Sequence, residues 1–190
     1  MSKRKPSHND SLPALSKGAG GGSSRLSPEF FIRDVLEVAP ALLGKWLVRQ
    51  FEDGHIKRYR ITEVEAYRGT EDRACHASKG RTPRSEVMFG QGGTVYVYLI
   101  YGMYWMLNLV TGFEGDASAV LIRGIEGFPG PGRAGRELRL NKSFYAESLI
   151  HSERIWLEDG EPVTEIKTSK RIGIDYAGEE WVNRMWRFFI

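Results

Sequence analysis

The stretch from Ile61 to Thr111, ITEVEAYRGTEDRACHASKGRTPRSEVMFGQGGTVYVYLIYGMYWMLNLVT, holds most of the unusual chemistry of this 190-residue chain. It opens with two carboxylates that alternate along a predicted strand. A basic loop with a single histidine follows, and the stretch closes on a long aromatic segment interrupted near its middle by a glycine. We therefore expect the segments before and after it to complete and support one domain built around these residues.

The two carboxylates lie in a segment with the composition of a β-strand. Residues 59–67, YRITEVEAY, are rich in β-branched and aromatic residues, which favours extended structure. Because side chains alternate across a strand, four residues are predicted to share one face: Ile61, Glu63, Glu65 and Tyr67. Taken alone, this face favours an edge strand whose charges discourage pairing with another sheet. The alternative is a carboxylate held beside an aromatic ring in a cleft, where it acts as a general base.

The aromatic segment is shorter than the roughly 20 apolar residues that a membrane-spanning helix needs. Its two-residue alternation instead predicts two strands, 94–100 and 103–110, which meet near Tyr101. Tyr96 and Tyr98 should share one face of the first strand. Tyr101 then falls at the tip of a hairpin, where an aromatic residue is usually a packed corner. A protein that separates stacked bases, however, needs an apolar wedge in such a place.

The flanking segments have the signals of further helices and strands. Ser27 followed by Pro28 is typical of a helix start. Pro40 is predicted to divide the apolar run that follows into two helices, the second of which ends at Gly44. Residues 68–93 form a long irregular connection, and loops of this length are often functional. The remaining predictions are a helix near 133–140 and strands at 47–51, 117–125, 155–158, 171–174 and 186–190.

Positive charge is concentrated at the start of the chain. The net charge is +3, but residues 1–25 carry five basic residues against one acidic residue, which leaves −1 for the remainder. We expect residues 1–25 to be a disordered, basic, Gly/Ser-rich tail and residues 26–190 to be the folded domain. The tail lacks the apolar run of a secretory signal. An anionic partner would therefore have to bind a local patch on the domain.

Two local clusters of basic residues are candidates for such a patch, although most charge clusters are simply solvated faces. The first lies in the irregular connection and comprises Arg73, Lys79, Arg81 and Arg84. The second comprises Arg123, Arg133, Arg136, Arg139 and Lys142. The segment 143–166 is acidic and is expected to face away from an anionic partner.

The cysteine and histidine content argues against a metal site. Cys75 is the single cysteine, and no set of His and Cys residues has ligand spacing. One cysteine also excludes an internal disulfide and agrees with a reducing compartment. We expect neither a metal nor a cofactor.

Five segments occur in the order and at the spacing of a known enzyme family. They are EVEAYRGTEDRACH (63–76), TPRSEVMF (82–89), GTVYVYLIYGMYWMLN (93–108), AVLIRGIEG (119–127) and NKSF (141–144). From about Glu29 to its end, the chain closely resembles the alkyladenine (3-methyladenine) DNA glycosylase family, the methylpurine glycosylases of bacteria and animals. We accordingly expect an α+β fold: a single domain with a curved, mostly antiparallel sheet, flanking helices and a protruding β-hairpin.

The resemblance implies a monofunctional DNA glycosylase of base excision repair. Such an enzyme flips alkylated or deaminated purines out of duplex DNA and hydrolyses the N-glycosidic bond with a Glu-activated water, leaving an abasic site. Glu65 matches the general base of the family. Tyr67 and Tyr98 match the aromatics on the two sides of the flipped base, and His76 and Asn108 match polar residues of the base pocket.

The resemblance also assigns residues that contact DNA around the pocket. Tyr101 matches the wedge that fills the space left by the flipped nucleotide, and Arg123 matches an arginine near the nucleotide backbone and the water. Arg81 and Arg84, from the basic loop, are further candidates for backbone contacts. Since no lysine is placed on the face of Glu65, we expect no Schiff-base lyase step.

Two other classes of function stay open from the residues alone. A non-catalytic nucleic-acid-binding β-domain would use the aromatics and arginines, but it leaves Glu63 and Glu65 without a task. A sugar-cleaving enzyme would use these two as a carboxylate pair, about 6–7 Å apart on one strand face. For the glycosylase, we expect a monomer that acts on double-stranded DNA with damaged purines and does not bind membranes. Its expected location is the cytoplasm, at the nucleoid, in a bacterium, or the nucleus in a eukaryote.

Overall fold

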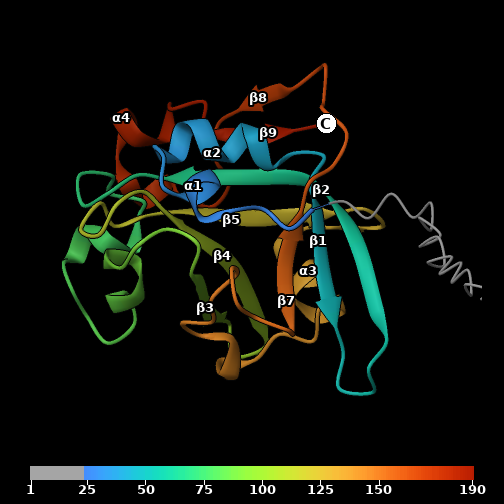
Figure 1. The fold of residues 1–190 in the computed structure, drawn as a ribbon. Coiled ribbons are helices and arrows are strands. Elements are labelled where there is room, and N and C mark those ends of the chain that lie inside the picture. The colour runs from blue at the N-terminus through green and yellow to red at the C-terminus, as the bar shows by residue number, and fades with distance from the viewer. Residues whose placement is uncertain (1–23) are drawn as a thin grey trace, which may run out of the picture.

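A long strand, β2 (Ile56–Tyr67), lies at the centre of the fold (Figure 1). The structure is a computed structural model that describes residues 24–190. The first half of β2 pairs antiparallel with β1 (Trp46–Gln50), and the second half pairs with β5 (Ser118–Ile125) and β9 (Arg187–Phe189). The expectation of an edge strand is therefore wrong, because the segment that carries the two glutamates has partner strands on both sides.

Within the described residues, nine strands form one antiparallel sheet, which confirms the predicted α+β class. The main order is β3–β4–β5–β2–β1–β7, while β6 pairs with β5 and β8 pairs with β9. The strands not yet given are β3 (Val95–Ile100), β4 (Tyr104–Thr111), β6 (Phe128–Pro129), β7 (Ile155–Glu158) and β8 (Lys167–Ser169). Residues 1–23 of the expected tail lie outside the part of the chain that the structure describes. Arg25 pairs with Glu158 in an isolated bridge.

Short helices cover the sheet. The α-helices are α1 (Pro28–Phe31), α2 (Val35–Leu42), α3 (Pro131–Glu137) and α4 (Glu179–Val182). The 3-10 helices are η1 (His76–Lys79), η2 (Glu86–Phe89), η3 (Lys142–Phe144) and η4 (Asp175–Ala177). α2 packs over β2 and β5 (Figure 1). None of the helices within residues 24–190 is long and apolar enough to cross a membrane.

The predicted break at Pro40 is wrong, because Pro40 lies inside α2. The two helices separate earlier, before Val35, where the Asp34 carboxylate accepts the backbone N–H of Leu36 at 2.9 Å. A side-chain cap of this kind starts a new helix. Pro40 costs α2 the hydrogen bond of one N–H, which a helix near its end tolerates better than one that continues.

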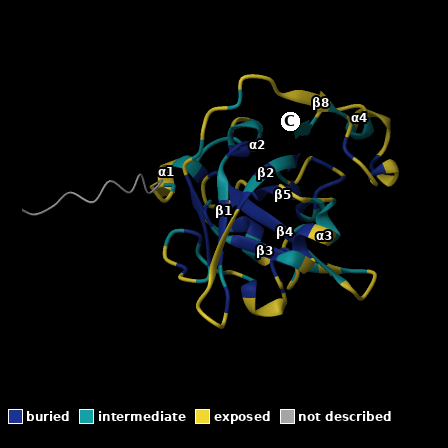
Figure 2. Cartoon of the chain, turned by 90° about the vertical axis from the view of Figure 1, so that its right-hand side faces the viewer, coloured by how far each residue is buried: buried dark blue, intermediate teal, exposed yellow. Residues whose placement is uncertain are grey.

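The main core lies between α2 and the sheet and is closed to solvent (Figure 2). Val38 and Leu42 of α2 meet Val64 of β2 in this core, and all three are fully buried. Ile61 belongs to the same core, so its predicted place on the face of Glu63 and Glu65 is wrong. The reason is an irregularity in β2, where the register with β5 shifts between Ile61 and Val64. Such a bulge changes the face to which the residues before it point.

The hairpin of β3 and β4 confirms the two predicted strands. Their ladder runs from the Val95–Leu109 pair to the Ile100–Tyr104 pair, and Tyr101, Gly102 and Met103 form the turn. Tyr101 has φ +52° and Gly102 has φ +69°. Positive φ is normal for glycine but strained for tyrosine. The Tyr101 side chain is 83% exposed, so this aromatic is not a packed corner.

The predicted strand at 171–174 is wrong, since these residues form an irregular bend. The backbone N–H of Ile172 donates to a side chain, the Glu65 carboxylate, instead of to a neighbouring strand. The neighbouring Arg171 buries its side chain in an ion pair with Asp72. Side-chain partners have replaced the regular ladder in this segment.

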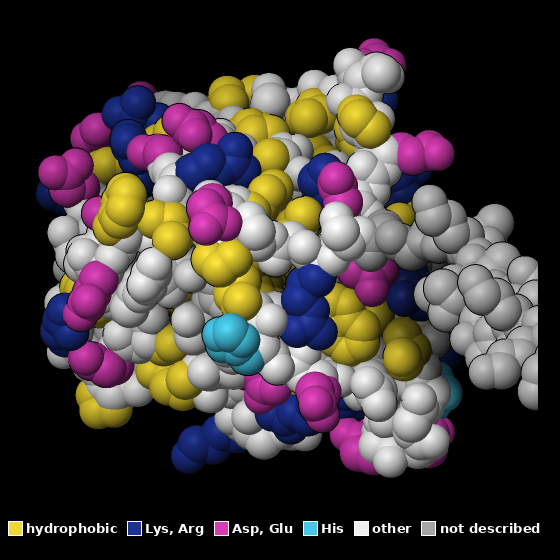
Figure 3. Space-filling model, in the orientation of Figure 1, with side chains coloured by type: hydrophobic (Ala, Val, Ile, Leu, Met, Phe, Trp, Pro, Cys, Tyr) yellow, Lys and Arg dark blue, Asp and Glu magenta, His cyan; other side chains and the backbone are white. Residues whose placement is uncertain are grey.

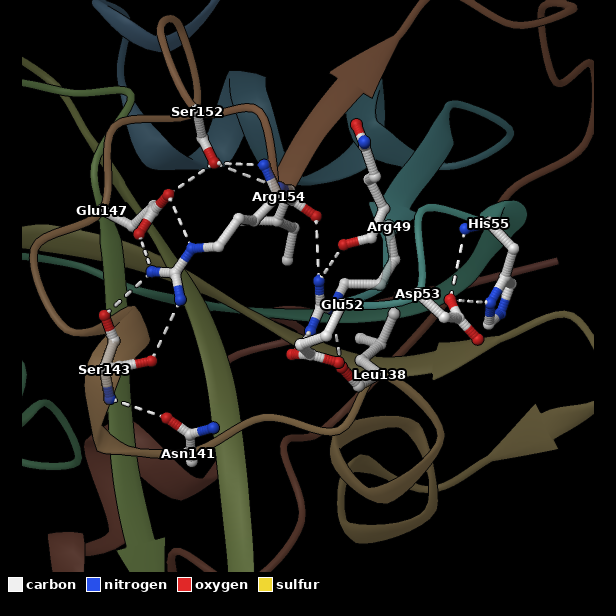
Figure 4. Close-up of polar contacts among 12 residues, drawn as sticks. Arg49, Glu52, Asp53, His55, Leu138, Asn141, Ser143, Glu147, Ser152 and Arg154 are labelled. Carbon is white, nitrogen blue, oxygen red and sulfur yellow. Dashed lines mark hydrogen bonds and ion pairs between the residues drawn. The ribbon is translucent and has the colours of Figure 1, made fainter.

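Two arginines, Arg49 on β1 and Arg154 just before β7, join segments that are distant in the sequence (Figure 4). Arg49 is fully buried and donates to the carbonyls of Leu138 and Arg154, at 2.9 and 3.3 Å. Arg154 pairs with Glu147 and donates to Ser143 Oγ at 3.1 Å. The guanidinium groups of both arginines lie over the ring of Phe144, at 4.8 and 4.3 Å. The NKSF segment therefore supports the fold.

Replacing Arg49 with Met should lower the free energy of unfolding by about 3 kcal/mol, because several buried carbonyls lose their donor. Urea denaturation followed by fluorescence measures this change. The control is Arg184→Met, which removes an exposed pair with Glu180 and should cost less than about 1 kcal/mol. Equal losses in the two variants would contradict the structural assignment of Arg49.

Candidate active site

Seven of the nine predicted site residues line one cavity of about 520 Å³. The seven are Tyr67, His76, Arg84, Tyr98, Tyr101, Asn108 and Arg123. They come from β2, the 68–93 connection, the β3–β4 hairpin and β5, and the segment 172–176 forms the remaining wall. A larger and more open groove of about 820 Å³ runs between α1, α2 and residues 159–166, but none of the predicted site residues lines it.

Glu65 has no solvent exposure and lies directly behind the cavity wall. Its Oε2 accepts the hydroxyl of Tyr67 at 2.8 Å, and its Oε1 accepts the backbone N–H of Ile172 at 2.8 Å. Arg123 Nη1 lies 3.4 Å from Oε1. All three neighbours line the cavity, so the carboxylate is one contact away from it.

Burial raises the pKa of Glu65 above the ordinary value for a glutamate. The positive charge of Arg123 and the hydrogen bonds from Ile172 and Tyr67 oppose this shift without cancelling it. A carboxylate with a raised pKa is a stronger base when it is ionised. Its basicity is thus set by removal from water and moderated by specific donors.

Glu63, on the same face of β2, is held in a different state. Its Oε1 accepts Arg123 Nε at 2.8 Å and Arg187 Nε at 2.7 Å. Burial alone would raise the pKa of Glu63, but the two guanidinium groups hold it below its ordinary value. Glu63 therefore stays ionised and fixes Arg123. This does not suit the proton donor that a pair of glycosidase carboxylates requires.

His76 is tied to both tyrosines of β3. Its Nδ1 lies 2.8 Å from the hydroxyl of Tyr96, and its ring meets the ring of Tyr98 edge to face, with 4.6 Å between centroids. Burial lowers the pKa of His76 to about 4, and the nearby charges of Arg84 and Lys79 act in the same direction. The imidazole is therefore neutral at physiological pH.

Asn108 and the tyrosines complete the polar lining. The Asn108 amide nitrogen donates to the backbone carbonyl of Tyr96 at 3.2 Å, which fixes the orientation of the amide. Asn108 and Tyr96 are directly paired on β4 and β3. Burial raises the pKa of Tyr98 to about 12, so its hydroxyl is protonated.

The three predicted arginines, Arg81, Arg84 and Arg123, lie in different places relative to the cavity. Arg84 stacks over the Tyr98 ring at 4.7 Å, at the cavity. Arg81 lies outside the cavity lining, paired with Glu86 at 2.9 Å and stacked over Phe89. Arg123 points inward to the glutamates. On the face drawn in Figure 3, basic and acidic side chains alternate, so this face is not a uniformly basic surface.

Several residues that shape the site were not predicted. Tyr176 and Ile172 line the cavity from the C-terminal segment, and Asp72 and Arg171 form a buried ion pair next to it. The sequence of 171–174 predicts a strand, and this gives no signal that would place the segment beside the cavity. Among residues 24–190, no group of three or more His, Cys, Asp or Glu residues could hold a metal ion.

Comparison with known proteins identifies the family of the chain. The profile of the family described as Methylpurine-DNA glycosylase (MPG) matches residues 29–129 and 126–190. The chain belongs to this family. It is therefore a methylpurine-DNA glycosylase-type enzyme, a hydrolase of N-glycosyl bonds that acts on DNA in base excision repair.

Similar proteins from both archaea and bacteria cover nearly the whole domain. A protein of Methanocella arvoryzae, named "Putative 3-methyladenine DNA glycosylase", is 45% identical over 184 residues, which covers 86% of this chain and 91% of that protein. Proteins with the same name from Legionella pneumophila (strain Corby) and Myxococcus xanthus are 43% and 44% identical. Both alignments cover 87% of this chain. They cover 94% of the Legionella protein and 89% of the Myxococcus protein.

The His76 ring of this glycosylase should titrate near pH 4 and remain neutral at pH 6. NMR of a sample with labelled histidines measures the midpoint, and His76→Gln assigns the signal. Because the folded pKa lies below the unfolded value of about 6.5, the unfolded chain binds more protons between these values. The contribution of His76 to stability is therefore complete above about pH 6.5 and is lost as the pH falls towards 4. A midpoint at or above 6 would contradict the burial of this ring.

Proposed function

We propose that this enzyme takes a damaged purine, flipped out of duplex DNA, into the cavity of about 520 Å³ and hydrolyses its N-glycosidic bond with water activated by Glu65. The products are a free base and an abasic site. One observation carries the proposal. A carboxylate with no solvent exposure and a raised pKa is hydrogen-bonded to residues that line an aromatic cavity.

The aromatic walls suit an extruded base. Extrusion from the stack costs a few kcal/mol, and the cost is lowest for damaged or mispaired bases. Each aromatic face that stacks on a base returns about 1–3 kcal/mol. Tyr67 and Tyr98 come from different strands and both line the cavity, so they supply two such faces. Asn108 and His76 present polar groups to the edges of the base.

Glu65 and Arg123 suit the hydrolytic step. The contact between Arg123 Nη1 and Glu65 Oε1 is the longest of the three contacts of the carboxylate, at 3.4 Å. Water enters most easily there, bound by both groups, and Glu65 takes its proton. The same negative charge stabilises the sugar as it gains oxocarbenium character. Among residues 24–190, no lysine lines the cavity, which favours attack by water over a Schiff base.

The polar groups around the cavity favour leaving groups that carry their own positive charge. With a pKa of about 4, His76 is neutral at physiological pH, so no imidazolium is present there to protonate the leaving base. An alkylated purine such as 3-methyladenine or 7-methylguanine is cationic and leaves without one. The name of the relatives, 3-methyladenine DNA glycosylase, agrees with this class of base. Neutral deaminated purines should react more slowly.

Tyr101 suits the wedge that replaces the flipped nucleotide. It lines the outer part of the cavity, yet its side chain is 83% exposed at the tip of the hairpin. The turn places Tyr101 directly after the last pair of the β3–β4 ladder. An aromatic ring presented in this way can enter a base stack from the groove.

Glu65→Gln should lower the single-turnover rate on duplex oligonucleotides that contain 7-methylguanine, hypoxanthine or ethenoadenine by about 10²–10⁴-fold. The amide keeps the shape of the side chain but cannot take a proton. Cleavage is read after alkali treatment, and binding is read by anisotropy with a duplex that contains an abasic analogue. Binding should change by less than about threefold, and the control Glu126→Gln, at an exposed site, should retain full activity.

Unchanged cleavage by Glu65→Gln would remove Glu65 from the mechanism. Borohydride trapping of a covalent protein–DNA adduct would contradict direct attack by water. Salt-sensitive DNA binding with no cleavage of any lesion would contradict the assignment of these purines as substrates.

Tyr101→Ala should slow single-turnover cleavage by about 5–150-fold, which corresponds to the loss of about 1–3 kcal/mol of stacking. The loss should be smaller when the lesion lies opposite a mismatched base, which already leaves the stack more easily. Phe113→Ala is the matched control, because Phe113 is 66% exposed on a turn and does not line the cavity. Equal effects of the two substitutions would argue against a wedge at Tyr101.

A further inference from the structure

Asp72 and Arg171 form an ion pair in which both side chains are fully buried. The two residues are 99 positions apart in the sequence. Arg171 Nη1 and Nη2 each donate to one carboxylate oxygen, the second at 2.9 Å. Neither residue lines the cavity, so neither can touch a bound base.

Arg171 is also bound to the strand that carries Glu65. Its Nη1 donates to the backbone carbonyl of Ala66 at 2.9 Å. Its guanidinium lies over the rings of Tyr67 and Trp186, at 4.8 and 5.0 Å. One planar group therefore fixes the backbone next to Glu65 and packs against the ring of Tyr67.

Asp72 holds the other side of the site. Its carboxylate accepts the backbone N–H groups of Arg68 at 3.2 Å and Ala74 at 3.0 Å. These bonds fold the chain as it leaves β2. Ala74 lines the cavity, and His76 lies two residues further on. The ion pair thus joins the base-binding loop to the C-terminal segment.

Two donors to Glu65 depend on this arrangement. Ile172, which follows Arg171 directly, donates its backbone N–H to Oε1. Tyr67, on which Arg171 stacks, donates its hydroxyl to Oε2. Through these neighbours, Arg171 controls both hydrogen bonds that orient the Glu65 carboxylate.

We propose that the Asp72–Arg171 ion pair is the positioning unit of the active site, which holds Glu65, Tyr67 and the His76 loop in their reactive arrangement. This inference rests on the proposed action of Glu65 as the base. A buried ion pair adds little net stability, because the loss of hydration offsets the attraction. Its geometry is specific, however, since a planar guanidinium binds a carboxylate through two bonds while it stacks on aromatic rings.

Arg171→Lys tests the proposal because it keeps the charge and removes the planar fork. The single-turnover rate at its high-pH plateau should fall about 10–100-fold, as expected when a catalytic group moves by about 1 Å. Affinity for a duplex with an abasic analogue should change less than threefold. Glu65 also loses donors to its ionised form, so the acid limb of the rate profile should move to higher pH.

Arg154→Lys is the matched control. Arg154 is also paired with a glutamate and stacked on an aromatic ring, but it lies outside the cavity lining (Figure 4). It should lower thermal stability while the rate and the acid limb stay unchanged. If Arg171→Lys does not fold, Asp72→Asn provides the test, because it keeps the size of the side chain and loses one bond to Arg171. Its rate should fall while its affinity is retained.

The outcomes distinguish failure of the positioning role from failure of the proposed function. If the wild type cleaves lesions and Arg171→Lys, or Asp72→Asn in its place, loses stability but keeps the wild-type rate and acid limb, the pair is only structural and the inference is overturned. If the wild type cleaves no lesion, the proposed function fails, and the positioning of a catalytic base fails with it.

Discussion

The candidate active site depends on keeping one carboxylate, that of Glu65, out of water. An ionised carboxylate is expensive to bury unless several donors surround it. Its three partners come from three parts of the chain: Tyr67 on the same strand, Arg123 on β5 and Ile172 in the C-terminal segment. β5 pairs with β2 and brings Arg123 to the glutamate, whereas Ile172 lies in the irregular segment before β9, the strand that pairs with the other edge of β2. The central position of β2 and the chemistry of the site therefore have the same structural origin.

The two glutamates of β2 show how neighbours separate the properties of identical side chains. Glu63 has two guanidinium groups bound to the same oxygen, and its pKa is lowered. Glu65 has one weaker contact with Arg123, and burial raises its pKa. Arg123 contacts both carboxylates, at 2.8 Å from Glu63 Oε1 and at 3.4 Å from Glu65 Oε1. Glu63 therefore stays ionised, and the raised pKa of Glu65 supports the proton transfer proposed for it, in the general pattern of paired carboxylates whose environments push their pKa values apart.

The sequence predicts the local elements better than the long-range contacts. The antiparallel hairpin, the β2 segment and the cavity-lining tyrosines follow from alternation and from the family motifs. The position of β2 inside the sheet does not, because its two partner strands come from 118–125 and 187–189. Segment 171–174 resembles a strand in composition, yet the Ile172 N–H donates to the Glu65 side chain, and the Arg171 guanidinium donates to Asp72 and to the Ala66 carbonyl. Arg81 was predicted to contact DNA by its charge, although Glu86 and Phe89 occupy its side chain.

The hairpin couples the proposed wedge to the pocket through rigid structure. Tyr98 on β3 and Asn108 on β4 line the cavity, and the continuous ladder between these strands ends at Tyr101. The ladder holds the backbone of the turn at a fixed place relative to the pocket, and Tyr101 has φ +52° there. Insertion of Tyr101 into a base stack would then place Tyr98 and Asn108 at a fixed distance from the vacated position. In the proposed mechanism, extrusion and recognition of the base are consequently one geometric event, and neither requires a moving lid.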